Sequence, residues 1–203
     1  MSTIVIGIDV GGEKKGFHAV ALQGDKFIAQ TTNQDSMAIV SWALHYYADV
    51  IAVDAPSRWS QSGSSRCAER ELYAHGIRCF YSPSKEVASQ KAFYGWMLNG
   101  EKLYDCLGLN HYPRFEGQVN NGKICIETFP HAIVWALSGL KIPEGTKRTI
   151  RREILTRKGY NISSLTNIDY LDAALCAIAA NEFSKPNYRP FGNREEGFII
   201  VPA

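Results

Sequence analysis

The sequence predicts an α/β fold in which a mixed sheet, an antiparallel meander plus parallel strands, carries helices on both faces. Two observations lead to this class. Short apolar runs alternate with longer segments of helical periodicity along the 203 residues. Near the N-terminus two such runs flank a turn dipeptide, whereas later runs are separated by helices, as parallel strands require.

The antiparallel part of the sheet is predicted at the N-terminus. Residues 3–9 form an apolar run that a glycine pair ends. Two further runs, 17–23 and 26–30, flank Gly24-Asp25, a dipeptide suited to the positive φ angles of a tight hairpin turn.

Helices and strands alternate after this meander. Asp35 is suited to cap a helix whose apolar residues recur at i, i+3, i+4 and i+7. The fully apolar run 50–53 is typical of a parallel strand covered on both faces. Gly76 fits a left-handed helix end and Pro130 a first helical turn. We therefore expect further strands at 50–54, 77–81, 123–127 and 198–201, with helices at about 36–47, 67–75, 83–93, 130–138, 146–158 and from 166 onward.

Length and composition indicate one globular domain over 1–203, with a hydrophobic fraction of 45% and a net charge of only +2. The aromatic and glycine-bearing segment 95–122 is interpreted as an insertion or lid. The five cysteines are scattered without a CxxC spacing, which argues against a zinc or redox site. No secretory signal and no apolar run of ~20 residues is visible. We therefore expect a protein of the cytoplasm that does not enter membranes.

Carboxylates stand at the ends of the predicted elements. Asp9, Asp54 and Glu127 each close an apolar strand, and Asp169 and Asp172 lie three residues apart on an alanine-rich helix. Neighbouring strands are about 4.8 Å apart, so the two strand-end aspartates should lie close together. Bare carboxylates at such a distance repel one another, and a divalent cation with oxygen ligands relieves that repulsion. The pattern favours a metal centre.

Each acid also has a plainer interpretation. Asp9 could serve the turn that follows it, and Asp54 could cap the next segment. Glu127 could pair with an arginine, and Asp169 could complete a capping box. Asp172 is the hardest to explain without a ligand, because it lies in mid-helix on the apolar side, where an unpaired carboxylate is costly.

Basic residues could bind phosphate next to these acids. The predicted helix 146–158 holds six basic residues and one acid. Its like charges at i, i+4 are unfavourable unless phosphates offset them, although a solvated helix face is the alternative. Three further arginines follow the 50–54 strand and could instead pair with nearby acids. The candidate substrate-binding residues are Arg58, Arg66, Arg70, Lys147, Arg148, Arg151 and Arg152.

The order of these motifs resembles the ribonuclease H-like fold. More closely, several segments are similar to the domain-of-unknown-function 429 family, whose members are predicted nucleases of this fold. The segments are Gly7-Ile-Asp9, Val53-Asp-Ala-Pro-Ser57, Arg66-Cys-Ala-Glu-Arg-Glu-Leu72, Glu127-Thr-Phe-Pro130 and Asp169-Tyr-Leu-Asp-Ala-Ala174.

The resemblance implies a metal-dependent hydrolase of phosphodiesters, acting on nucleic acid or a nucleotide with two Mg²⁺ or Mn²⁺ ions. Asp9 would bridge both ions, and Asp54 and Asp172 would be further ligands. Glu127 or Asp169 would complete the set or orient the attacking water.

Two other functions remain open from the sequence. The first is a nucleotide-binding enzyme of the sugar-kinase and actin-like superfamily, which shares the core fold and an early Asp-x-Gly turn. The second is a non-catalytic binding module of the same fold, in which the acids form structural ion pairs.

Overall fold

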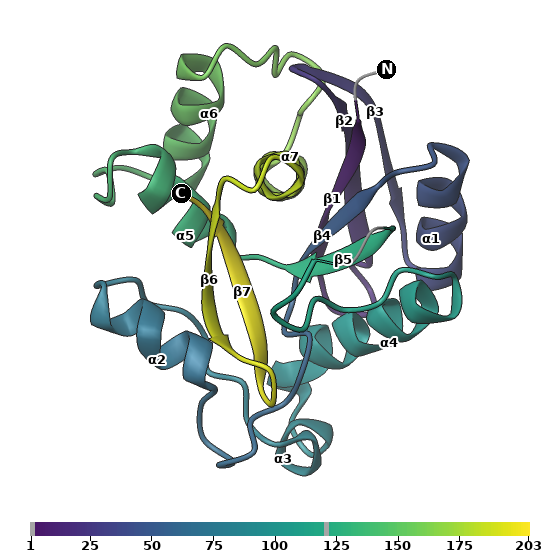
Figure 1. The fold of residues 1–203 in the computed structure, drawn as a ribbon, viewed down its shortest axis with the longest axis vertical. Helices are drawn as coiled ribbons and strands as arrows, with labels where there is room; N and C mark the ends of the chain where they lie inside the picture. Colours follow the sequence, from purple (N-terminus) through teal and green to yellow (C-terminus); the bar gives the residue numbers. More distant parts are fainter. Residues whose placement is uncertain (1–2, 120–121) are drawn as a thin grey trace.

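The structure, a computed structural model that describes residues 3–119 and 122–203, is built on one mixed sheet with helices on both faces (Figure 1). The strands are Ile4–Val10 (β1), Phe17–Gln23 (β2), Lys26–Asn33 (β3), Val50–Asp54 (β4), Ile124–Glu127 (β5), Tyr188–Asn193 (β6) and Gly197–Pro202 (β7). The helices are Ser36–His45 (α1), Cys67–Ala74 (α2), Lys85–Ser89 (α3), Gly95–Leu109 (α4), Pro130–Leu137 (α5), Lys147–Arg157 (α6) and Ile168–Ser184 (α7), with a 3₁₀ turn at Ala92–Tyr94.

The seven strands follow the order β3-β2-β1-β4-β5-β7-β6. The meander β1-β2-β3 is antiparallel, whereas β1, β4, β5 and β7 run parallel. The edge strand β6 returns antiparallel to β7. The predicted α/β class with a mixed sheet is confirmed, and the arrangement is consistent with the ribonuclease H-like description.

The predicted capping and turn residues lie at the ends of the helices and strands, as expected from the sequence. The Asp35 carboxylate accepts a hydrogen bond from the Met37 backbone N–H at 3.0 Å and so caps α1. Gly24 and Gly76 adopt positive φ angles of 60° and 77°. The cap of α7 is Asn167, whose side chain accepts from the Tyr170 N–H. A capping role for Asp169 is therefore wrong, and this carboxylate is free for other contacts.

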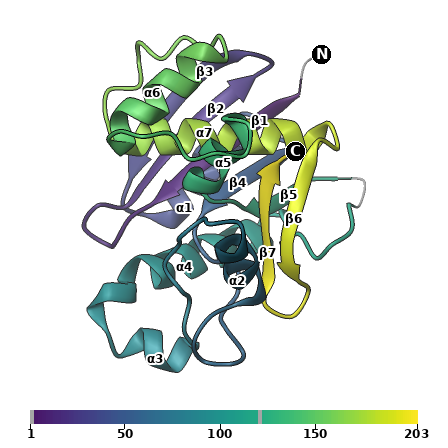
Figure 2. The ribbon, with the colours of Figure 1, turned by 90° about the vertical axis from the view of Figure 1, so that its left-hand side faces the viewer.

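Helix α7 lies across β1, β2 and β4 on one face of the sheet, with α5 and α6 beside it (Figure 2). The opposite face is covered by α1 and α4, which pack on the apolar side chains of the same strands. All five cysteines are free thiols. Within residues 3–119 and 122–203, no helix is long and apolar enough to cross a membrane.

Gly7 in the middle of β1 sets the distance between α7 and the sheet. A Cβ atom at this position would lie 2.0 Å from the carbonyl oxygen of Ala173 and 2.1 Å from the nitrogen of Ala177. Both contacts are with helix backbone, which cannot rotate away as a side chain can. The glycine and the small residues of α7 therefore bring the helix axis unusually close to β1.

Two differences from the sequence prediction concern strands. Residues 77–81 form no strand, because the segment leaves the sheet and exposes Phe80 and Tyr81 beside α3. A short apolar run does not distinguish a strand from an irregular segment. Strand β6 was not predicted, because it carries Pro190 and Gly192, which are tolerated at the edge of a sheet.

The segment 95–122 is also different from the expected lid. Residues 95–109 form α4, whose Leu103, Tyr104 and Leu107 are fully buried in the core. Its Tyr104 hydroxyl donates to the Ala55 carbonyl at 3.1 Å, and Asn99 donates to the Gly11 carbonyl at 2.9 Å. Hydrogen bonds from this helix therefore hold the two loops that follow β1 and β4 in place. Residues 120–121 lie outside the described residues.

Replacing Gly7 by alanine should destabilise the protein by about 1–3 kcal/mol or more, because α7 must move away from β1. The matched control is Gly108→Ala on α4, where an added Cβ meets nothing within 4 Å. That control should be neutral or slightly stabilising, since alanine favours helix over glycine. Urea unfolding of both variants measures the difference. Equal stabilities of the two variants would contradict the role assigned to Gly7.

Candidate metal centre

Three of the predicted carboxylates converge at the carboxyl edge of the sheet. Asp9 at the end of β1 is in register with Asp54 at the end of β4. Asp172 reaches the same place from the first half of α7, which lies close to β1 because of Gly7. All three line a hollow of about 450 Å³. The predicted convergence of these strand ends with α7 is thus present in the fold.

The rest of the hollow is mainly basic and aromatic. In the part of the chain that the structure describes, neither Arg78 nor Lys147 forms an ion pair, so both cations are available to an anion. Phe80 is 62% exposed and contacts Phe93 edge-on at a ring distance of 5.5 Å. The remaining lining residues are Val10, Cys79, Trp96, Phe129, Pro130, His131 and Arg151.

Asp9 is the buried acid of the group, and its Oδ2 has no hydrogen-bond partner among the described residues. The nearest cation, the Lys15 ammonium, is 3.6 Å from that oxygen, too far for a hydrogen bond. Burial raises the pKa of Asp9 to about 7; Lys15 opposes this rise, and Asp172 and Asp169 add to it. The carboxylate form is therefore poorly compensated by the protein itself.

Asp54 and Asp172 have environments of the same kind. Burial raises the pKa of Asp54 well above its ordinary value, and the charges of Asp9 and Asp172 raise it further. Burial also raises the pKa of Asp172, although Arg151 partly offsets this effect with a hydrogen bond of 2.7 Å from its Nε. Among the described residues Arg151 is the cation that hydrogen-bonds to this group, in which Asp9 is buried and Asp54 and Asp172 are partly buried.

Asp169 lies on the other side of Asp9, next to β2. Its Oδ1 is 2.7 Å from the Lys15 ammonium and its Oδ2 is 3.8 Å from Nε2 of His18. Ligand atoms of Asp9, His18 and Asp169 all lie within 4.8 Å of one another, which is close enough to share one ion. Burial lowers the pKa of His18, so its imidazole is neutral near pH 7 and suited to bind a metal.

Glu127 is brought to the same edge but is already paired. Its two oxygens accept from the guanidinium of Arg66, and Oε2 also accepts from the Ser57 N–H at 2.7 Å. Both side chains are buried, and Arg66 also pairs with Glu69. The interpretation of Glu127 as an arginine partner therefore describes the structure, and Glu127 is not among the residues that line this hollow. Arg66, 1% exposed, is a structural residue and not a phosphate ligand.

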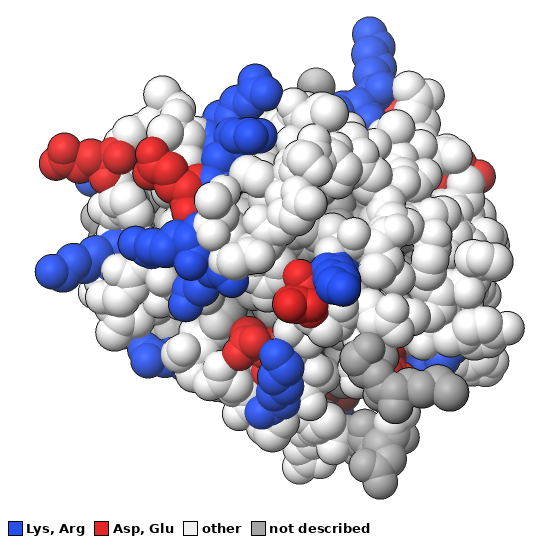
Figure 3. All heavy atoms as spheres, turned by 90° about the horizontal axis from the view of Figure 1, so that it is seen from above, with Lys and Arg blue, Asp and Glu red and all other residues white. Residues whose placement is uncertain are grey.

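The remaining basic candidates fall into two groups. Lys147 and Arg151 of α6 line the hollow, and Arg151 is held by Asp172. Arg58 pairs with Glu116, Arg70 pairs with Glu196, and Arg148 donates to the Thr166 carbonyl. Arg152 lines a separate hollow on α6. Figure 3 shows cationic side chains gathered with acids on the left, the side on which α6 lies in Figure 1.

Lys15, His18, Arg78 and His131 belong to the centre but were not among the predicted site residues. Lys15 and His18 come from the β1-β2 hairpin, and His18 is the β2 residue in register with Asp9. The predicted hairpin joined 17–23 to 26–30, so the pairing of Asp9 with His18 was not predicted. Arg78 lies in the segment 77–81, which was predicted to be a strand. That prediction gave no reason to expect its side chain in the hollow.

The donors at this edge are of the kind that a hard divalent cation binds. Within the described residues, the ligand atoms that lie within 4.8 Å of one another come from Asp9, His18 and Asp169, while Asp54 and Asp172 line the hollow on the other side of Asp9 and are not part of that group. The Oδ2 of Asp9 is a buried acceptor without a donor among these residues. A bound ion would supply the charge compensation that Arg151 alone does not. These residues are therefore suited to hold Mg²⁺ or Mn²⁺.

The pKa of Asp9 predicts how stability depends on pH in metal-free buffer. The carboxyl ionises at its ordinary value of 3.8 when unfolded and near 7 when folded. Its contribution to stability is therefore greatest below pH 3.8 and is lost as the pH rises to about 7. Asp9→Asn should gain stability over the native protein across this range, by up to a few kcal/mol at its upper end.

Urea unfolding of Asp9→Asn and the native protein at several pH values, with a chelator present, measures this gain. A stability difference that does not change with pH would contradict it. Adding Mn²⁺ should reduce the advantage of the variant, because a bound ion stabilises the native cluster.

Comparison with known proteins identifies a family for the chain. A family model described as "Protein of unknown function (DUF429)" matches residues 7–196. No curated protein and no solved structure matched the sequence. The matched range contains the second half of β1 and all of β4, β5 and α7, and so includes every carboxylate of the centre. The chain therefore belongs to the DUF429 family of proteins of unknown function.

Proposed function

We propose that the protein is a divalent-metal-dependent phosphodiester hydrolase, a nuclease, with its active site in the hollow at the ends of β1 and β4. The observation that carries this proposal is the meeting of Asp9, Asp54 and Asp172 in one hollow, where burial raises the pKa of Asp9 and Asp54 and one Asp9 oxygen has no hydrogen-bond partner among the described residues. Such a cluster contributes little to the stability of the fold, but it is well suited to bind a divalent cation.

The cations would be Mg²⁺ or Mn²⁺, held by Asp9, Asp54 and Asp172, with Asp169 at the β2 side of Asp9. When bound, such an ion would neutralise the negative charge that develops on the phosphate oxygens as the phosphodiester bond is broken. Glu127 is left out of the ligand set, because Arg66 occupies both of its oxygens.

The substrate would be nucleic acid bound along the basic and aromatic wall. Arg78 and Lys147 are cations without an acidic partner in the described residues, and both face the hollow, where they can bind phosphate oxygens. The exposed ring of Phe80 offers a surface on which an unpaired base can stack.

His131 is the group in the hollow best suited to accept a proton from an attacking water. Burial, together with the charges of Arg151 and Lys147, lowers the pKa of its imidazole, which is then neutral at pH 7. Its Nδ1 is buried and has no partner among the described residues. We further propose a cytoplasmic location, because five free thiols suit a reducing compartment.

One observation favours a non-catalytic binding module as the alternative. Lys15 and Arg151 already pair with Asp169 and Asp172, as structural ion pairs would. A nucleotide-binding enzyme of the sugar-kinase and actin-like type has less support, because the hollow is lined by acids that would repel a polyphosphate in the absence of metal.

Asp9→Asn should abolish Mn²⁺-dependent cleavage of a panel of single- and double-stranded RNA and DNA, while Asp35→Asn, which changes only the exposed cap of α1, should leave cleavage in place. Gel electrophoresis of labelled substrates, with and without Mn²⁺, measures the effect. Cleavage unchanged in Asp9→Asn would refute the mechanism. Calorimetry showing no Mn²⁺ binding to the native protein would support the binding module instead.

The basic wall can be tested separately from the chemistry. In the Asp9→Asn background, Arg78→Glu with Lys147→Glu should weaken binding of a single-stranded oligonucleotide and reduce the slope of log K against log salt by about 1 to 2. Arg148→Glu with Arg152→Glu changes the same charge outside the hollow and is the matched control. Fluorescence anisotropy at several salt concentrations measures both. Equal losses in the two double variants would show that binding is not directed to the hollow.

A further inference from the structure

The Asp9 carboxylate divides the acidic cluster into two sides. Its register partner on β4 is Asp54, and its register partner on β2 is His18. Asp172 shares the β4 side, where all three aspartates line the hollow. Asp169, His18 and Lys15 form the β2 side, and none of them is among the residues that line the hollow. The two sides therefore differ in their access to a substrate.

We propose that the Lys15 ammonium is a built-in cation that fills the β2 side, so that the protein binds a single divalent metal, on the β4 side. This inference rests on the proposed function. It replaces the two ions that the family resemblance implies with one ion and one lysine.

The position of the ammonium carries the proposal. It lies 2.7 Å from Oδ1 of Asp169 and 3.6 Å from Oδ2 of Asp9, between the two acids that together with His18 could hold an ion. One of these groups has a buried atom without a hydrogen-bond partner in the described residues, Oδ2 of Asp9, and His18 turns its Nε2 toward Asp169 at 3.8 Å. The Lys15 side chain is 47% exposed whereas those of Asp9 and Asp169 are 10% and 18% exposed, so the ammonium reaches inward from the surface to two largely buried acids.

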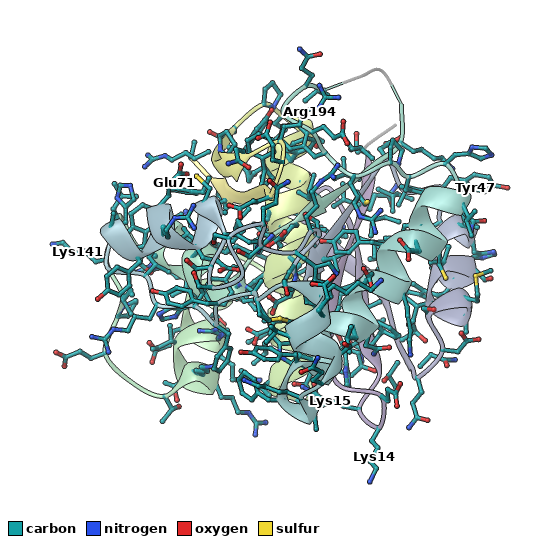
Figure 4. All side chains as sticks on the ribbon, turned by 90° about the horizontal axis from the view of Figure 1, so that it is seen from below. Lys14, Lys15, Tyr47, Glu71, Lys141 and Arg194 are labelled. Carbon is teal, nitrogen blue, oxygen red and sulfur yellow. The ribbon has the colours of Figure 1, made fainter. Side chains whose placement is uncertain are left out.

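The β1-β2 loop is shaped to hold the lysine there. The Gly11 N–H donates to the Gly16 carbonyl at 2.8 Å, and the Lys15 N–H donates to the Gly12 carbonyl at 2.9 Å. A Cβ on Gly11 would lie 2.6 Å from Cδ and 2.8 Å from Cγ of Lys15, so the missing side chain makes room for the lysine stem. In Figure 4 Lys14 points away from the molecule, whereas Lys15 lies against it.

The experiment is a titration of metal-free protein with Mn²⁺ in a calorimeter, using the native chain, Lys15→Met, Lys15→Gln and the control Lys14→Met. The native protein and the control should bind one ion. Both Lys15 variants should bind two, the second held by Asp9, His18 and Asp169. Lys15→Met combined with Asp169→Asn should return the number to one.

Two ions in the native protein, or one ion in both Lys15 variants, would overturn the proposal. Thermal unfolding of each variant checks the fold, and Lys15→Gln keeps a polar side chain of similar length in case the methionine perturbs the loop. The absence of Mn²⁺ binding in every variant would be a different result, because it would remove the metal centre of the proposed function itself.

Discussion

The close contact between Gly7 and the backbone of α7 is the constraint on which the candidate site depends. Because β1 carries no side chain at this position, Ala173 and Ala177 lie directly on the strand. One turn toward the N-terminus of the helix, Asp172 and Asp169 are then held on the two sides of Asp9. A larger residue in β1 would move the helix outward and separate these acids, so the spacing of the site is set by backbone packing and not by the acids themselves.

The same sheet edge holds two kinds of carboxylate. Glu127 ends β5 with a guanidinium on both oxygens, whereas Asp9 ends β1 with an oxygen that has no partner among the described residues. Both are buried, so the difference is not one of exposure. The chain places an arginine beside one strand end and only a distant ammonium beside the other. A buried acid without a partner lowers the free energy of unfolding. Such an acid is more typical of a binding site than of a structural ion pair.

Much of this arrangement could be predicted from the sequence, because its signals are local. The hairpin at Gly24, the strand ends at Asp9 and Asp54, and the long helix with Asp172 all follow from short patterns. Contacts between distant residues were beyond such patterns. Arg66 and Glu127 are 61 residues apart, and nothing in either segment indicates that they pair. The bracing role of α4 likewise depends on which loops it meets in three dimensions.

Whether a buried acid is a metal ligand or one half of an ion pair can therefore be decided only when the basic residues around it are known. From the sequence, Asp9, Asp54, Glu127 and Asp172 are equivalent acids at the ends or on the inner face of apolar elements. In the fold, Arg66 removes Glu127 from the set, and Arg151 and Lys15 reduce, but do not cancel, the charge around the other acids. The unpartnered oxygen of Asp9 remains, next to a hollow that Arg78 and Lys147 also line, and neither of these cations forms an ion pair among the described residues. The acids would attract a metal ion to this hollow, and the basic wall would attract a phosphate. The positive charge of the ion and the negative charge of the phosphate would then offset one another.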